Sequence, residues 1–225
     1  FAVRKIAPDG RVSTLAGGGT GAAVDGKGKD AIFARPFGIA VDASGHVYVA
    51  DTEAHTIRKV TRDGTVTTIA GLAHAAGTSD GIGAEARLNR PRDVAVDATG
   101  NLFVADEFNH TIRKITPAGV VSTMAGSPGE AGSADGLGAD ARFYRPGGLT
   151  VSPEGAIYVA DSWNHTIRKI TSAGSVTTVV GTPGIRGFVG DELPGVLSFP
   201  QRIAVLAQSM YVTTARGVAV ISRRP

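Results

Sequence analysis

The sequence predicts an all-β fold, and three observations lead to that prediction. Nearly the same stretch of chain starts at Pro36, Pro91 and Pro146, at intervals of 55 residues. Each copy divides into short alternating or β-branched segments separated by Asp, Gly and Ser turns. The chain holds 31 glycines but only 6% aromatic residues, as is typical of many turns and short strands. A repeat of this length with four short strands indicates the blade of a β-propeller, because one blade cannot bury both of its faces alone.

The first copy shows the four strands in order. They are expected at residues 38–42, 46–50, 56–60 and 65–69. AspAlaSerGly at 42–45 and ThrArgAspGly at 61–64 each supply a hairpin turn in which glycine tolerates a positive φ. The segment HVYVA at 46–50 alternates as a half-buried strand does, and TVTTI at 65–69 is rich in β-branched residues. Each blade is therefore a four-stranded antiparallel sheet, and we expect its first strand to lie innermost.

The ends of the chain suggest how the array closes. Residues 3–17 match a third and fourth strand, whereas the decayed copy that starts at Pro200 supplies a first, second and third strand. We therefore expect one domain over residues 1–225 with four blades, closed by pairing of the N-terminal and C-terminal strands. This arrangement hides both sheet edges and predicts a monomer. The expected blades are 36–71, 91–126 and 146–181, with a closing blade formed by 200–225 plus 1–17.

An alternative blade count stays open, because two segments compete for one place. Val3–Ile6 and Val218–Ser222 both match a third strand. This surplus would fit part of a six-bladed propeller. Between the blades run links over 17–35, 71–90 and 126–145, each of which ends in an apolar residue and then ArgPro. We expect the apolar residue, Phe33, Leu88 or Phe143, to plug the space between neighbouring blades.

Composition limits the classes of partner. Lysine and arginine total 23 and aspartate and glutamate 20, and the basic residues recur along the repeats without forming blocks. This pattern predicts no nucleic acid partner, which would need one basic face. No apolar run approaches the ~18 residues of a spanning helix, so no membrane partner is expected. The absence of cysteine excludes disulfides, thiolate zinc sites and thiol catalysis, and it leaves the compartment open, with a secreted or periplasmic location favoured.

Several motifs resemble the NHL repeat, the blade type of NHL β-propellers. They are TyrValAlaAsp at 48–51 and 158–161, AsnHisThrIleArgLys at 109–114 and 164–169, and the Gly-x-Val that follows. The resemblance covers three copies strongly and the last weakly. It implies an antiparallel propeller used mainly as a binding platform. It also implies that an enzyme is possible, since some similar propellers are lyases, lactonases or other hydrolases with metal sites around the axis.

The polar residues that recur in every blade have two interpretations. Each of the three blades repeats an Asp, a His and an Arg near the turn between its second and third strands, and each link repeats an Asp in a glycine-rich loop. Because active sites break symmetry and scaffolds repeat it, the favoured interpretation is structural and no cofactor is expected. The alternative is zinc or calcium, held by imidazole or carboxylate ligands. Its candidate ligands are His55, His110, His165, Asp25, Asp80 and Asp135.

Positions that depart from the repeat are better candidates for binding. Phe108 and Trp163 stand at the turn position where the first blade has Glu53, and an aromatic residue there would be exposed and could anchor a partner. Arg92 and Arg202 replace small residues at the start of inner strands, where they would place charge at the mouth of the channel.

These residues lead to a functional hypothesis. We expect a non-catalytic scaffold that holds a protein, peptide or glycan through Phe108, Trp163, Arg92 and Arg202. The alternative is a metal-dependent lyase or lactonase-like hydrolase with a site at the propeller axis. The last repeat has Thr214, Val218 and Ile221 in place of Asp, His and Arg, so a closed ring of ligands would be incomplete. That gap favours the scaffold.

Overall fold

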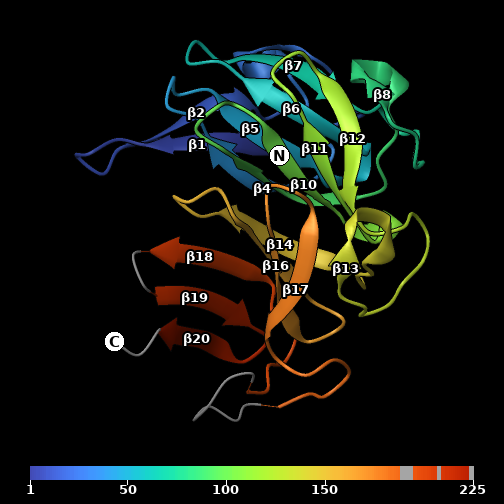
Figure 1. Ribbon diagram of the computed structural model, residues 1–225. Coiled ribbons are helices and arrows are strands. Elements are labelled where there is room, and N and C mark those ends of the chain that lie inside the picture. The colour runs from blue at the N-terminus through green and yellow to red at the C-terminus, as the bar shows by residue number, and fades with distance from the viewer. Residues whose placement is uncertain (188–194, 207–208, 223–225) are drawn as a thin grey trace.

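The computed structural model describes residues 1–187, 195–206 and 209–222, and these form an all-β propeller (Figure 1). Three complete blades follow one another, each an antiparallel sheet whose strands lie in chain order. Their strands are β4 (Pro36–Val41), β5 (Val47–Asp51), β6 (Thr56–Val60) and β7 (Thr65–Ala70); β9 (Pro91–Val96), β10 (Leu102–Asp106), β11 (Thr111–Ile115) and β12 (Val120–Ala125); and β14 (Pro146–Val151), β15 (Ile157–Asp161), β16 (Thr166–Ile170) and β17 (Ser175–Val180). The predicted propeller of four-stranded antiparallel blades is confirmed.

The first strands lie innermost, as expected. β4 contacts β9, β9 contacts β14, and β14 contacts β18 (Arg202–Leu206). The approach is closest at Gly38, where a Cβ atom would lie 2.4 Å from the Cα of Asp93, and at Gly148, where it would lie 2.4 Å from the carbonyl oxygen of Gln201. Any larger residue would push these inner strands apart.

The links add an outer strand that the sequence analysis did not predict. Each link carries a two-residue strand that pairs with the fourth strand of the blade that follows it, and then a single 3₁₀ turn. These are β3 (Gly26–Lys27) with η1 (Gly28–Asp30), β8 (Gly81–Ile82) with η3 (Gly83–Glu85), and β13 (Gly136–Leu137) with η5 (Gly138–Asp140). The link therefore covers the outer edge of the next blade before the chain returns to the axis.

The two ends of the chain form separate sheets. β1 (Ala2–Ile6) pairs with β2 (Val12–Gly17), and β18 pairs with β19 (Ser209–Thr214), which pairs with β20 (Gly217–Ser222). Among the described residues the fourth blade thus has three strands, and Figure 1 shows β1 and β2 at one end of the row of blades and this sheet at the other. The predicted pairing of N-terminal with C-terminal strands is absent among the described residues; 207–208 and 223–225 of the predicted closing blade lie outside them.

The two ends of the chain do not pair because each of them supplies a third strand. The register of β1 on β2 matches that of β6 on β7, including the shift after the second residue of the strand, so β1 is a third strand. β20 is also the third strand of its sheet. One four-stranded blade has a single third-strand position, and the two terminal sheets cannot share it.

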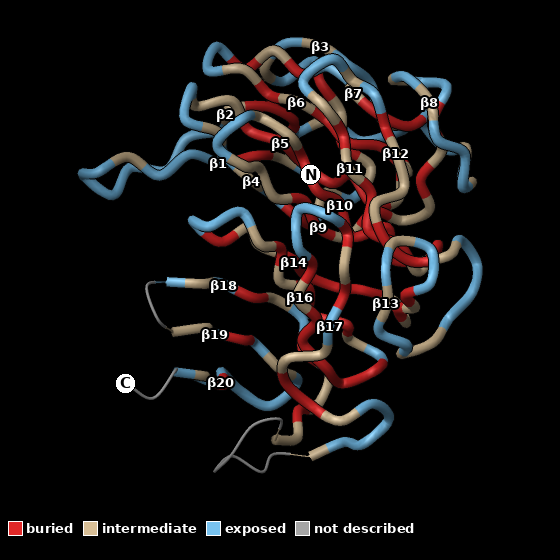
Figure 2. The backbone as a smooth tube through the Cα atoms, in the orientation of Figure 1, coloured by how far each residue is buried: buried red, intermediate tan, exposed pale blue. Residues whose placement is uncertain are grey.

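The core lies between neighbouring blades, where the red segments of Figure 2 meet. Leu88 is fully buried among residues of β5 and β6 on one side and of β9 to β12 on the other. Phe143 lies in the same way between the second and third blades, and Phe33 between the N-terminal hairpin and the first blade. The prediction that these residues plug the spaces between blades is confirmed. Among the described residues, no helix is long and apolar enough to cross a membrane.

Candidate functional site

The residues that recur in each blade form a buried ion-pair network. In the second blade, the guanidinium of Arg113 donates to Asp106 at 2.9 Å and to Asp80 of the link at 2.7 Å. It also donates to the carbonyl oxygens of Arg87 and Ser79. The Asp80 carboxylate in turn accepts from the backbone N–H and the hydroxyl of Thr123. Arg113 therefore joins the link, the second strand and the third strand at one buried point.

The same network occurs in all three complete blades, and it accounts for the predicted link carboxylates. Asp25 pairs with Arg58 and Asp135 with Arg168, each at 2.7 Å. Burial raises the pKa of Asp106 to about 6, and the charge of Arg113 together with amide donors opposes this rise. Asp25, Asp80 and Asp135 use their carboxylate oxygens in these bonds.

The three histidines each hold a junction between blades. His55 follows the 3₁₀ turn η2 (Thr52–Ala54) and His110 follows η4 (Glu107–Asn109), both in the left-handed conformation. The Nδ1 atoms of His55 and His110 accept the backbone N–H of Arg90 and Arg145 of the next blade at 3.0 and 3.1 Å, and His165 does the same for Phe199. Burial lowers the pKa of all three imidazoles, and the positive charge of a neighbouring arginine lowers it further.

These bonds also stabilise a strained backbone. Arg90, Arg145 and Phe199 have φ values of 53°, 49° and 47°, a region that residues other than glycine rarely occupy. Each precedes a proline that opens the inner strand or approaches it. In the described part of the chain, no three His, Asp or Glu side chains converge in a way that could hold a metal ion. The three histidines thus make hydrogen bonds across the junctions between blades.

Phe108 and Trp163, in contrast, come together on one exposed end of the blades. The guanidinium of Arg145 lies 4.4 Å from the ring centroid of Phe108 and 4.8 Å from that of Trp163. Trp163 also contacts Tyr144 and Phe199, with centroids 5.3 and 5.8 Å apart. Trp163 is 39% exposed, so the stack lies at the surface.

Arg92 and Arg202 meet nearer the axis at the same end of the blades. Both guanidinium groups lie over the ring of Phe37, at 4.5 and 5.5 Å. Arg202 pairs with Asp93 and donates to the carbonyl oxygen of Phe37 at 2.8 Å, so it links the fourth blade to the first two. Arg92 lies 3.3 Å from Glu107. We call the surface made by Phe37, Arg92, Arg202, Phe108, Arg145 and Trp163 the aromatic face.

Two members of the aromatic face, Phe37 and Arg145, were not predicted from the sequence. Phe37 is 43% exposed at the start of β4, and Arg145 belongs to the ArgPro pair that ends a link. A comparison of the two junctions in the sequence could have identified Arg145. Arg90 follows a blade that carries Glu53, whereas Arg145 follows a blade that carries Phe108 at the same position.

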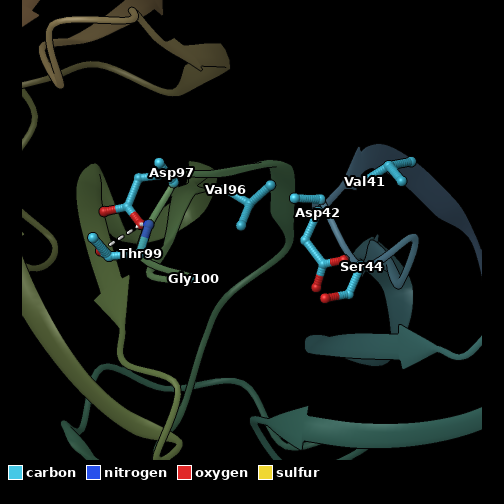
Figure 3. Close-up of a pocket in the computed structure, with 9 residues that line it drawn as sticks. Val41, Asp42, Ser44, Val96, Asp97, Thr99 and Gly100 are labelled. Atoms are coloured by element: carbon cyan, nitrogen blue, oxygen red, sulfur yellow. Dashed lines mark hydrogen bonds between the residues drawn. The ribbon is translucent and has the colours of Figure 1, made fainter.

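An open depression lies at the other end of the blades, between the first hairpin turns of neighbouring blades (Figure 3). Its volume is about 410 Å³, and Asp42 and Asp97 contribute the carboxylates. Asp97 accepts from the backbone N–H groups of Thr99 and Asn101, and Asp42 accepts from His46 and Tyr48. These carboxylates stabilise their own turns, which accounts for their presence.

The three repeats match a known repeat family. A family model of the NHL repeat matches residues 33–60, 88–115 and 143–170. NHL repeat-containing protein 2 of Bos taurus is 36% identical in an alignment 149 residues long, which covers 60% of this chain and 20% of that protein. Protein SUPPRESSOR OF QUENCHING 1, chloroplastic, of Arabidopsis thaliana is 34% identical over 61% of this chain and 14% of its own length. The chain spans a fifth or less of these relatives.

Solved structures share the fold at low identity. An auxiliary nutrient binding protein from Bacteroides ovatus has a TM-score of 0.68 at 17% identity, over 97% of this chain and 58% of that one. A protein of unknown function from Bacteroides thetaiotaomicron has a TM-score of 0.67 at 24% identity, over 83% of this chain and 47% of that one. A virginiamycin B lyase from Staphylococcus aureus has a TM-score of 0.53 at 18% identity, over 84% of this chain and 56% of its own. Propellers of this shape therefore include both binding proteins and enzymes.

Proposed function

Since the chain belongs to the NHL-repeat family of β-propellers, we propose that it is a non-catalytic scaffold that binds a protein, peptide or glycan through the aromatic face. The fold itself supports a binding or scaffold role. One observation supports this choice of surface: the positions that depart from the repeat gather at one end of the blades as partly exposed aromatic rings stacked with arginines. Half-exposed aromatic and arginine side chains are the residue types that contribute most to binding energy.

The rival hypothesis is a metal-dependent lyase or lactonase-like hydrolase at the propeller axis. Its candidate ligands are engaged elsewhere: the histidines accept backbone N–H groups through Nδ1, and the link carboxylates bind arginine and threonine. A catalytic carboxylate or imidazole needs its reactive atom within reach of a substrate. The scaffold proposal needs no change in these contacts.

Binding to peptide and glycan libraries tests the proposal. Trp163→Ala should weaken the binding of selected ligands at least ~10-fold, as expected for an aromatic residue at the centre of an interface. The matched control is Arg62→Ala, which removes an exposed arginine at the opposite end of the blades and should leave binding unchanged. Ligands whose affinity falls with Arg62→Ala and not with Trp163→Ala would contradict the proposed surface.

Metal analysis tests the rival directly. Protein purified without chelator should contain no stoichiometric zinc or calcium under the scaffold proposal. A stoichiometric ion that is lost in His110→Asn would support the metal enzyme instead.

A further inference from the structure

Arg145 differs from its counterpart Arg90 in what surrounds the guanidinium. Arg90 donates to Glu53 at 2.5 Å on one side and lies 5.2 Å from the ring of Phe108 on the other. Arg145 occupies the same place one blade later, with Phe108 where Arg90 has Glu53 and Trp163 where Arg90 has Phe108. The two junctions share backbone geometry and the histidine contact. They differ by one carboxylate.

The replacement leaves the Arg145 guanidinium between two rings with no acceptor oxygen in hydrogen-bond contact among the described residues. Two aromatic faces attract the cation but use none of its five N–H donors. The rings also restrict the Arg145 side chain, so this side chain loses less conformational entropy when a ligand binds. Arg145 is thus a preorganised cation whose donor edge has no partner within the described chain.

The other two arginines of the aromatic face, and the neighbouring Arg90, are each paired with a carboxylate. Arg92 faces Glu107, Arg202 faces Asp93, and Arg90 faces Glu53. The Arg90 guanidinium holds the pKa of Glu53 below its ordinary value, as a bound carboxylate should show. Charge complementarity at Arg145 therefore calls for an acidic group on the ligand.

We propose that Arg145, between Phe108 and Trp163, binds the side-chain carboxylate of an acidic peptide segment whose neighbouring residues are apolar. This inference rests on the proposed scaffold function and specifies its ligand. Glu53 of this chain shows how such a carboxylate can bind, because a polypeptide turn presents it to Arg90, the arginine equivalent to Arg145. Half-exposed Trp163 and Phe108 beside the guanidinium suit the apolar neighbours of that carboxylate. An arginine can hold a carboxylate through two parallel N–H bonds.

The test uses a hexapeptide library with one fixed glutamate among apolar residues and a matched library with glutamine at that position. Binding to the whole chain is measured by fluorescence anisotropy. Glutamate peptides should bind about ten- to a hundredfold more tightly than glutamine peptides, the range of a charge-assisted hydrogen bond. Arg145→Gln should remove that difference. Absence of binding by any glutamate peptide would overturn the proposal, as would preference for hyaluronan oligosaccharides, which carry their carboxylates on sugars.

Variants at Phe108 and Glu53 test the proposal by adding a carboxylate beside Arg145 or by removing the carboxylate beside Arg90. Phe108→Glu places a carboxylate beside Arg145 and should compete with the ligand, so glutamate peptides should bind about tenfold more weakly than they bind the uncharged control Phe108→Gln. Glu53→Phe removes the partner of Arg90 and should create a second site, which raises the peptide stoichiometry from one to two. A gain of binding cannot result from misfolding. Equal binding by both Phe108 variants, together with unchanged stoichiometry in Glu53→Phe, would overturn the proposal.

The outcomes also separate this inference from the proposed function. If Trp163→Ala weakens binding while glutamate and glutamine peptides bind equally, the aromatic face is a binding surface and the carboxylate site is wrong. If binding is insensitive to Trp163→Ala, the proposed function itself is wrong.

Discussion

Replacing Arg113 by methionine should be among the most damaging substitutions in the chain. The side chain is 1% exposed and its guanidinium donates to two carboxylates and two backbone carbonyl oxygens. Methionine fills a similar volume without charge. The substitution leaves Asp106 fully buried without its counter-ion and removes the donor of the Arg87 carbonyl oxygen. The Ser79 carbonyl oxygen still accepts the backbone N–H of Arg87.

The magnitude follows from the partners that are stranded. Removing one member of a buried ion pair costs about 3–5 kcal/mol, because the remaining charge stays in a poorly solvating environment. The hydrogen bond lost by the partly buried Arg87 carbonyl adds about 1 kcal/mol. We therefore expect Arg113→Met to lower the free energy of unfolding by at least ~3 kcal/mol, a large part of the ~5–15 kcal/mol typical of a domain.

Urea unfolding followed by circular dichroism measures this loss, with Arg4→Met as the matched control. Arg4 has the same register on β2 that Arg113 has on β12, but it is exposed. Arg4→Met should change stability by less than ~0.5 kcal/mol. If Arg113→Met costs no more than Arg4→Met, the network does not hold the blade together and the reasoning is refuted.

Three other predictions follow from the structure. The folded state lowers the pKa of His110, so the contribution of this residue to stability is complete above the ordinary value of 6.5 and is lost as pH falls through the lower folded value. His110→Asn should therefore reduce the fall of the urea midpoint below pH 6.5. An unchanged slope of midpoint against pH would refute the junction role. Gly126→Ala should lower the free energy of unfolding by over ~2 kcal/mol, because its Cβ would lie 2.6 Å from the His110 carbonyl oxygen. Gly129→Ala, also at positive φ but with open space around it, should lower it by only the ~1–2 kcal/mol of backbone strain. Equal losses of stability would count against the close approach at Gly126. β1 and β20 each leave one edge unpaired among the described residues, so the expressed 225-residue chain should self-associate, whereas a closed ring would be a monomer. Light scattering measures this mass. A monomer mass that does not change with concentration would show that these edges are covered.

The repeats made the blades predictable from sequence. Each turn and each strand occurs in three copies, so a local signal such as the turn glycine Gly64 before TVTT in the first blade is supported by Gly119 and Gly174 at the same position of the next two blades. The apolar plugs Leu88 and Phe143 were predictable for the same reason. The outer strands β3, β8 and β13 were not, because two residues are too few to show alternation.

Closure and the binding surface depended on information that one repeat does not contain. Pairing between the ends of the chain is set by which strand position each end occupies, and the duplicate third strand, β1 and β20, prevented it. Phe108 and Trp163 were found as departures from the repeat, but Arg145 completes their site from the link between two blades. Its role emerges only when three segments are placed in space.

The central claim is that repeated residues build this propeller, while its ligand binds where Phe108 and Trp163, which depart from the repeat, flank the repeated arginine Arg145. It is tested most directly by measuring peptide affinity and urea stability together in Trp163→Ala. We expect affinity to fall at least ~10-fold while the free energy of unfolding falls by less than ~2 kcal/mol, because Trp163 is 39% exposed and loses only ring contacts at the surface. Unchanged affinity with a loss of stability as large as that of Arg113→Met would contradict the claim.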